Sequence, residues 1–287
     1  MKNNECFLLI KAWGSGFWSD VSHVAGQLLI AELTNRIPII FWGVDSGYAS
    51  EKPIIKDAFS MYFLPVSNYS VNDLKNKNYT FFPSKWNQGN LHRGDLKDLS
   101  DLTENSIGNV FRSCENVIVS NIHIYVNYLI QWINKSHPLY GLDIEDIYKY
   151  LYQKHLTLQP YLFNEIEDFY SKNMKNKHPI LGVHIRGSDK IHECPNLQEI
   201  NNSYQQKIDS YLLDNPHSSI LNRTPFDHVS VHNGGVHYDN TKQKGIEIIK
   251  DTYLAMKCDH FIGNHSSNVS VAISRLKSWA PKTITLL

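Results

Sequence analysis

The sequence lacks an excess of charge of either sign. Its 287 residues include 28 Lys and Arg and 28 Asp and Glu, so the formal net charge is zero. Proteins that bind nucleic acid non-specifically usually carry a basic excess, so we expect no nucleic-acid partner. Any site for an anion must therefore be built from a few placed residues rather than from the field of the whole chain.

Cysteine is scarce as well, since only Cys6, Cys114, Cys194 and Cys258 occur and they are far apart. The absence of a CxxC pair argues against a zinc site and against a disulfide framework. A reduced, cytoplasmic setting is the prediction. The first apolar stretch, residues 6–10, is too short for a signal sequence or a membrane span. We therefore expect no transmembrane segment and leave peripheral membrane association open.

Strand-like and helix-like patterns alternate in both halves of the chain. Apolar runs at residues 7–10 and 37–42 predict buried strands. A loop rich in Gly and Ser, residues 13–22, and a helix over residues 23–34 lie between them. Strand, loop, helix and strand in this order form a βαβ unit, which is typical of parallel sheets. The alternation resumes near residue 158, so we predict two α/β lobes, residues 1–157 and 158–287, with a cleft between them.

The remaining elements follow from the same periodicities. Residues 45–101 show weak periodicity and predict loops and short elements. Further strands are expected at 117–120, 179–185, 260–263 and 284–287, and further helices at 125–133, 143–152, 160–170, 204–213, 244–256 and 266–276.

The segment from His184 to Lys190 is the first candidate site. It follows a dense apolar strand, and ligands of open α/β sheets bind beyond the carboxyl ends of strands. The alternation of a strand places His184 and Arg186 on the same side. Arg186 offers a bidentate fork to a diphosphate and Lys190 a mobile charge, while Asp189 could orient one of them. An ordinary polar loop with a surface ion pair is the alternative.

This pattern, His-x-Arg-x-x-Asp-Lys after a Gly-Val strand, resembles the donor motif of the α1,6-fucosyltransferases. The group includes the eukaryotic core fucosyltransferase and the rhizobial nodulation enzyme. Related motifs occur in α1,2- and protein O-fucosyltransferases. The resemblance implies a GT-B-like fold with two Rossmann-type lobes. It also implies an inverting enzyme that moves fucose from GDP-fucose to a glycan acceptor and needs no metal.

The order of residues further along the chain is similar to that family. The resemblance implies that Asp251 accepts hydrogen bonds from guanine N–H groups and that His184 contacts the base or the ribose. It also implies that Ser266 and Ser267 hold the β-phosphate. Ser266 is the expected N-cap of the last helix, where free N–H groups and the helix dipole favour an anion. A plain N-cap without a ligand is the alternative.

Gly14, Gly16 and Gln27 stand where the family has a Gly-rich loop followed by a Gln-Leu helix. They are weaker candidates for substrate binding, because a lone Gly-x-Gly is a weak signal. Aromatic residues beside this loop would suit either sugar stacking or core packing, and they are Trp13, Phe17 and Trp18.

Sugar transfer needs a stabilised leaving diphosphate and a base for the acceptor hydroxyl. Arg186, Lys190 and the Ser pair would stabilise the developing charge. Glu193 is the candidate base, although the family's Glu falls one residue later, where this chain has Cys194. A solvated loop Glu is the alternative. Residues 143–146, Asp-Ile-Glu-Asp, are expected on a helix surface and not at a metal.

The resemblance fails after Ile220, where a strand begins and a polar stretch follows at once. The donor lobe could lack one strand, or build it from residues 229–231. Two alternatives therefore stay open: transfer from another nucleotide sugar, or a non-catalytic relative that binds nucleotide or glycan. A metal hydrolase based on His228, His232 and His237 is disfavoured, because they have neither helical spacing nor a carboxylate pair nearby.

Overall fold

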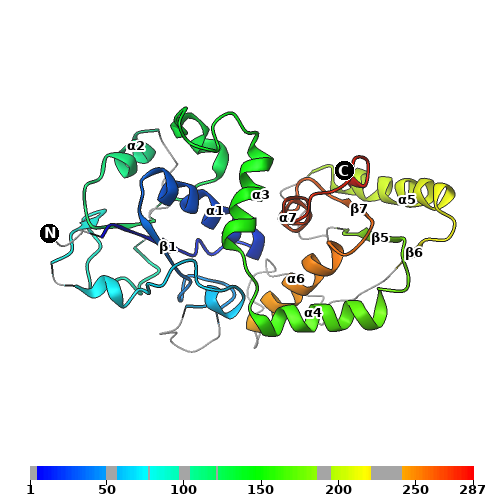
Figure 1. Cartoon of the computed structure of the whole chain (residues 1–287), viewed down its shortest axis with the longest axis horizontal. Helices are drawn as coiled ribbons and strands as arrows, with labels where there is room; N and C mark the ends of the chain where they lie inside the picture. Colours follow the sequence, from blue (N-terminus) through cyan, green and yellow to red (C-terminus); the bar gives the residue numbers. More distant parts are fainter. Residues whose placement is uncertain are drawn as a thin grey trace. The chain divides into compact units, whose positions relative to one another are not determined.

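The computed structural model describes residues 5–49, 57–76, 78–96, 104–120, 122–185, 195–220 and 241–287. The chain divides into two compact units, Met1–Gln159 and Pro160–Leu287. In Figure 1 the first unit runs from blue to green and the second from green to red. The predicted boundary after residue 157 lies two residues before this division.

The first unit is built on a parallel sheet of four strands in the order β2-β1-β4-β3. Its central strand β1 (Phe7–Lys11) is buried along its whole length, which explains the unbroken apolar run in the sequence. It pairs with β2 (Ile37–Phe41) on one side and with β4 (Val117–Val119) on the other. The short β3 (Phe81–Phe82) adds to β4.

Helix α1 (Phe17–Leu33) connects β1 to β2. It begins six residues before the predicted residue 23, so the expectation of a loop as far as residue 22 was wrong. The reason is that Phe17 and Trp18 are 2% and 1% exposed and pack in the core as the first helical residues. Gly26, inside this helix, permits a close approach, since a Cβ there would lie 2.7 Å from the carbonyl oxygen of Ile124.

The rest of the first unit consists of short elements and two helices. The side chain of Asp143 accepts a hydrogen bond of 2.8 Å from the Asp146 N–H and caps α3 (Ile144–His155). Asp143 to Asp146 are exposed at the start of this helix, as predicted. Helix α2 (Glu104–Arg112) was not predicted. The 3-10 helices are η1 (Phe59–Met61), η2 (Asp73–Lys75) and η3 (Val126–Trp132).

The second unit has its own parallel sheet, in the order β6-β5-β7-β8. Strands β5 (Ile180–Val183) and β7 (His260–Gly263) are central, and β8 (Ile284–Leu286) is one edge. Strand β6 (Ser219–Ile220) is the other edge and pairs with β5. The strand expected to begin near Ser218 is therefore present, whereas residues 229–231 lie outside the described part of the chain.

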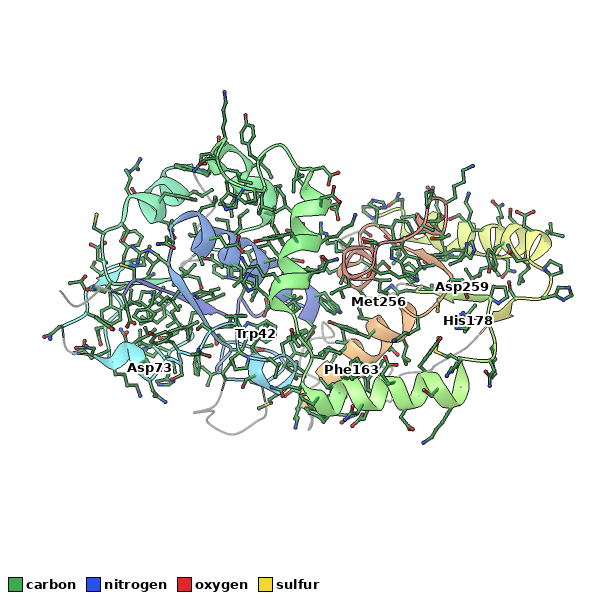
Figure 2. All side chains as sticks on the ribbon, viewed as in Figure 1. Trp42, Asp73, Phe163, His178, Met256 and Asp259 are labelled. Carbon is green, nitrogen blue, oxygen red and sulfur yellow. The ribbon has the colours of Figure 1, made fainter. Side chains whose placement is uncertain are left out.

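The amino ends of β5 and β7 are joined by His178 and Asp259, which lie next to each other in Figure 2. The Asp259 carboxylate accepts hydrogen bonds from the Ile180 N–H and the His178 ring, both at 2.6 Å. Burial raises the pKa of Asp259, but the hydrogen bonds from Ile180 and His178 outweigh this effect. The pKa of Asp259 therefore lies below its ordinary value.

The described residues of the second unit also form the helices α4 (Pro160–Asn173), α5 (Leu197–Asp214), α6 (Thr241–Ala255) and α7 (Asn268–Leu276). Helix α6 packs against both α4 and α7 (Figure 1). Trp279 follows α7, and its indole N–H donates a hydrogen bond of 3.1 Å to the Ile273 carbonyl oxygen of that helix.

Candidate functional site

Four of the predicted site residues, Arg186, Asp189, Lys190 and Glu193, lie outside the described residues. Their roles stay predictions. His228, His232 and His237 also lie outside the described part of the chain. The described part of the candidate site consists of His184, Asp251, Ser266, Ser267 and their neighbours.

His184 follows directly on β5 and is held by both its backbone and its ring. Its backbone N–H donates to the Ile262 carbonyl oxygen at 2.9 Å, which extends the pairing with β7. Its own carbonyl oxygen accepts a bond of 2.8 Å from the Tyr204 hydroxyl. Burial raises the pKa of Tyr204 to about 12, so this hydroxyl keeps its proton. The His184 Nδ1 atom lies 2.8 Å from the Ser270 Oγ atom. The ring is thus tied to a helix that begins 84 residues later.

Ser270 belongs to the first turn of α7 and is fully buried. Its Oγ also accepts a hydrogen bond of 3.1 Å from the Asn264 backbone N–H. Gly263 makes this contact with the sheet feasible, because a Cβ at 263 would lie 2.6 Å from Ser270 Oγ. No signal in the sequence singled out Ser270, since a serine inside a helix is usually an unremarkable polar residue.

Helix α7 begins two residues after the predicted residue 266, and its N-cap lies one residue after the predicted one. Ser267, not Ser266, is the N-cap, and its side chain makes no capping hydrogen bond. The expectation that Ser266 caps the helix was therefore wrong. The Ser266 hydroxyl instead donates to Asn264 Oδ1 at 2.7 Å, and the Ser266 backbone N–H donates to the same oxygen at 2.8 Å. Both serines remain together at the helix N-terminus, where the predicted phosphate would be held.

This helix start has the polar groups that an anion requires. The first N–H groups of any helix have no partner within it, and here the Ser267 side chain does not supply one. Asn264 is fully buried, and its Nδ2 atom has no hydrogen-bond partner in the described part of the chain. Backbone N–H groups, a side-chain amide and the helix dipole can together bind a phosphate oxygen.

Asp251 lies on α6, four residues before the helix ends, and is half-buried. Helix α6 packs against α7, and both helices belong to the second unit. The structure thus gathers His184, Ser266 and Ser267 around α7 and places Asp251 on the adjacent helix.

The Gly-rich loop of the first unit is fixed by Asp20. The Gly14 and Ser15 N–H groups both donate to its carboxylate at 3.1 Å, and Asp20 is fully buried. Gly14 has a φ of 92°, a conformation that favours glycine. Gly16 occupies the N-cap position of α1. Gln27 is 2% exposed and donates its side-chain amide to the Ile122 carbonyl oxygen at 3.2 Å.

The aromatic residues beside this loop separate into two groups. Phe17 and Trp18 belong to the core, where Phe17 makes edge contacts with Trp42, Tyr48 and other rings. Trp13 is half-buried and stacks on His123 with ring centroids 5.3 Å apart. Of the two explanations for these aromatics, core packing holds for Phe17 and Trp18.

The sequence did not indicate a hollow of about 560 Å³ in the first unit. Its lining residues are Val44, Asp45, His92, Arg93, Gly94 and Asp95. A Cβ on Gly14 would lie 3.0 Å from the Asp45 carbonyl oxygen, so the Gly-rich loop borders this hollow. Burial and the charges of Lys75 and Lys11 lower the pKa of His92, which favours a neutral imidazole.

Behind the hollow lies a buried charge pair. Lys11 is fully buried, and its Nζ atom donates to the Leu91 carbonyl oxygen at 2.9 Å. The same Nζ atom lies 3.8 Å from Asp45 Oδ2. The residues that line the hollow include the acids Asp45 and Asp95, the imidazole of His92 and the guanidinium of Arg93. Groups of these kinds can form hydrogen bonds with hydroxyl groups.

No protein-family model matches this chain, and no curated sequence does. Solved structures match over almost the whole chain. The NodZ α1,6-fucosyltransferase soaked with GDP-fucose is 19% identical, with a TM-score of 0.55 over 95% of this chain and 92% of that one. A second structure, of the fucosyltransferase NodZ from Bradyrhizobium, is 18% identical, with a TM-score of 0.55 over 94% of this chain and 92% of that one.

POFUT1 in complex with GDP-fucose is 12% identical, with a TM-score of 0.58 over 99% of this chain and 97% of that one. The chain has the fold of these fucosyltransferases. The predicted GT-B-like class, with two α/β lobes built on parallel sheets, is thereby confirmed. At this level of identity the likeness concerns the fold, and the chemistry has to be argued from the residues of this chain.

Two further observations concern the described residues only. They contain no group of three or more His, Cys, Asp or Glu side chains placed to share a metal ion. None of their helices has both the length and the apolar character that a bilayer crossing requires.

Proposed function

We propose that this chain is a glycosyltransferase that moves fucose from GDP-fucose to a hydroxyl group of a glycan. The observation that carries the proposal is the start of α7, where Ser266 and Ser267 stand at an N-terminus without a side-chain cap. His184, the first residue of the donor motif, is hydrogen-bonded to the same helix. Of two proteins with the same fold, NodZ has been soaked with GDP-fucose and POFUT1 has been solved in complex with it.

The donor nucleotide would be bound mainly by the second unit. The N–H groups at the start of α7 and the hydroxyl of Ser267 would hold the β-phosphate, because the helix dipole favours negative charge there. Asp251 would accept hydrogen bonds from the guanine N–H groups, and His184 would contact the base or the ribose. Together these groups would bind a nucleoside diphosphate, and Asp251 would make guanine the preferred base.

The transfer step would break the bond between the fucose C1 atom and the β-phosphate oxygen. The acceptor oxygen would form a bond to C1 from the opposite face, so the configuration would invert. Arg186 and Lys190, with Asp189 to orient them, would stabilise the departing GDP. Glu193 would take the proton of the acceptor hydroxyl. No metal ion is required in this scheme.

The first unit would face the acceptor. The hollow beside Asp45 and His92 offers carboxylate and imidazole groups, and the loop with Gly14 and Gly16 borders it. A glycan presents many hydroxyl groups that both donate and accept hydrogen bonds, which such groups can meet. The side-chain amide of Gln27 is bonded to the Ile122 carbonyl oxygen, so we assign Gln27 a structural role rather than a contact with the acceptor. The cytoplasm remains our proposal for the location.

Calorimetric titration of the purified chain with GDP, UDP and ADP tests the donor assignment. We expect micromolar binding of GDP and weaker binding of UDP and ADP. Arg186→Ala should weaken GDP binding about 10- to 100-fold, because hydrogen bonds to charged groups contribute roughly 1.5–3 kcal/mol. Arg112→Ala is the matched control, because this exposed arginine of α2 uses its guanidinium to donate a hydrogen bond of 3.2 Å to Asn109 Oδ1 of the same helix.

A transfer assay with GDP-fucose and a panel of oligosaccharides, with and without EDTA, tests the reaction. Loss of activity in EDTA would contradict the metal-independent scheme. Preference for UDP or ADP would favour another nucleotide-sugar donor. Binding of GDP without transfer to any acceptor would favour a non-catalytic relative, and the absence of any nucleotide binding would refute the donor site itself.

A further inference from the structure

Two hydrogen-bonding groups converge on the buried hydroxyl of Ser270. The Asn264 backbone N–H donates to Ser270 Oγ at 3.1 Å, and His184 Nδ1 lies 2.8 Å from the same oxygen. Ser270 and Asn264 are both fully buried. Water therefore does not compete for this hydroxyl, and its proton must go to one of the neighbouring protein groups.

The direction of the bond to His184 follows from counting protons. A serine hydroxyl has one proton and two lone pairs, and the Asn264 N–H occupies one lone pair. In the described part of the chain, His184 Nδ1 is the only acceptor within hydrogen-bond distance of the Ser270 hydroxyl. If Nδ1 carried a proton of its own, the buried hydroxyl would lack an acceptor, at a cost comparable to a lost hydrogen bond. The hydroxyl must therefore donate, and Nδ1 must accept.

We infer that Ser270 is a positioning residue that holds His184 as the neutral tautomer with its proton on Nε2. His184 then acts toward the nucleotide as a hydrogen-bond donor, and its partner is an oxygen atom of the phosphate, the ribose or the base. The partner rests on the proposed function, whereas the tautomer does not. Asn264 fixes the orientation of the Ser270 hydroxyl, so the loop that begins α7 and the ring of His184 form one hydrogen-bonded unit.

This arrangement depends on the close packing of α7 on β7. The missing side chain of Gly263 leaves room for Ser270, whose Oγ would otherwise collide with a Cβ at 2.6 Å. The tautomer of His184 is therefore set by a side chain that need not touch the ligand. This is an arrangement in which a second residue fixes which ring nitrogen carries the proton.

Long-range ¹H–¹⁵N spectra of the full chain labelled with ¹⁵N-histidine test the inference directly. The signals of His184 are those that disappear in His184→Gln. We expect Nδ1 of the wild type to resonate as an unprotonated ring nitrogen and Nε2 as a protonated one. In Ser270→Ala the two signals should move toward each other, because the ring then exchanges between tautomers. A protonated Nδ1 in the wild type, or an unchanged pattern in Ser270→Ala, would overturn the inference.

Titration with GDP provides the second measurement. Ser270→Ala should weaken GDP binding about 3- to 10-fold, the effect of one lost hydrogen bond. Ser274→Ala is the matched control, one turn later on α7, because its Oγ donates only to the Val271 carbonyl oxygen at 2.7 Å. It should change neither the His184 signals nor GDP binding by more than about twofold.

The two hypotheses can fail separately. If the wild type has the expected tautomer but binds no GDP, the proposed function fails and the role of Ser270 stands. If GDP binds but Nδ1 is protonated, the role of Ser270 fails and the proposed function stands. Should Ser270→Ala fail to fold, Ser270→Cys keeps a similar volume with a weaker donor and should show the same change of tautomer to a smaller extent.

Discussion

Replacing Gly263 with Ala tests the packing that underlies the whole site. The added Cβ would lie 2.6 Å from Ser270 Oγ and 2.7 Å from both Ser270 Cβ and a ring carbon of Phe261. Real Cβ atoms essentially never come within 3.0 Å of such neighbours, so α7 or the ring must move. Overpacking of this kind costs about 1–3 kcal/mol. We expect Gly263→Ala to lower the free energy of unfolding by about 2 kcal/mol.

Alanine substitutions at two other glycines should cause smaller losses of stability and serve as comparisons. A Cβ at Gly182 would meet the Cys258 Sγ at 3.0 Å, a milder conflict, so Gly182→Ala should cost about 1 kcal/mol. A Cβ at Gly47 has no neighbour within 4 Å, and Gly47→Ala should stay within about 0.5 kcal/mol of the wild type.

Urea denaturation followed by circular dichroism measures these differences. A loss of 2 kcal/mol corresponds to a fall in Tm of about 4–8 °C. Unfolding of Gly263→Ala at the same urea concentration as Gly47→Ala would refute the overpacking at Gly263, and so would a larger loss of stability in Gly182→Ala than in Gly263→Ala. Gly263→Ala should also weaken GDP binding, because Ser270 is displaced from His184.

Three further predictions concern the first unit. Asp143→Ala should lower the free energy of unfolding by about 1 kcal/mol in urea titrations, because α3 loses its N-cap. Asp57 has its pKa raised from 3.8 to about 6 by burial, so its ionised form is disfavoured in the folded state. The stability of the wild type relative to Asp57→Asn should therefore fall as the pH rises from about 4 to about 6, in urea titrations at each pH. Asp45→Ala should cost about 3–5 kcal/mol by the same method, because Lys11 remains buried without its carboxylate. The controls are specific: Asp143→Asn keeps the capping oxygen, and Lys11→Met should rescue Asp45→Ala. A flat pH dependence for the Asp57 pair, or no rescue at Lys11, would contradict the respective argument.

Most of the strands could be predicted from the sequence because they are short apolar runs, whereas the two-residue β3 was not predicted, because it lies in a stretch of weak periodicity. Strands β1 and β7 stand out since each apolar run is bordered by polar or glycine residues. Their parallel pairing followed from the alternation with helices. The fold class was predictable for the same reason: both sheets are covered by helices whose apolar faces repeat every three to four residues.

The helix starts were harder to predict. Helix α1 begins with aromatic residues inside a Gly-rich stretch, and such a composition usually indicates a loop. Helix α5 begins seven residues before the predicted residue 204, because Leu197 and Ile200 alone supply the buried face of a polar first turn. Tertiary packing decided both cases, and a single sequence contains no direct record of it.

The candidate site was predictable only where neighbours in sequence are neighbours in space. His184 and the Ser266-Ser267 pair each follow a recognisable strand. The hollow of the first unit was not predictable, because Asp45 and His92 come from loops 47 residues apart. The contact between Ser270 and His184 spans 86 residues and depends on the absence of a side chain at Gly263.

The placement of tryptophan gives this molecule a built-in optical label. Of its six tryptophans, Trp279 alone belongs to the second unit, and its indole is bonded to α7. The other five lie in the first unit and report on that unit. A variant in which those five are replaced by phenylalanine would emit from one indole beside the helix that carries the proposed phosphate site. Its fluorescence could then follow nucleotide binding and the unfolding of the second unit, independently of the first.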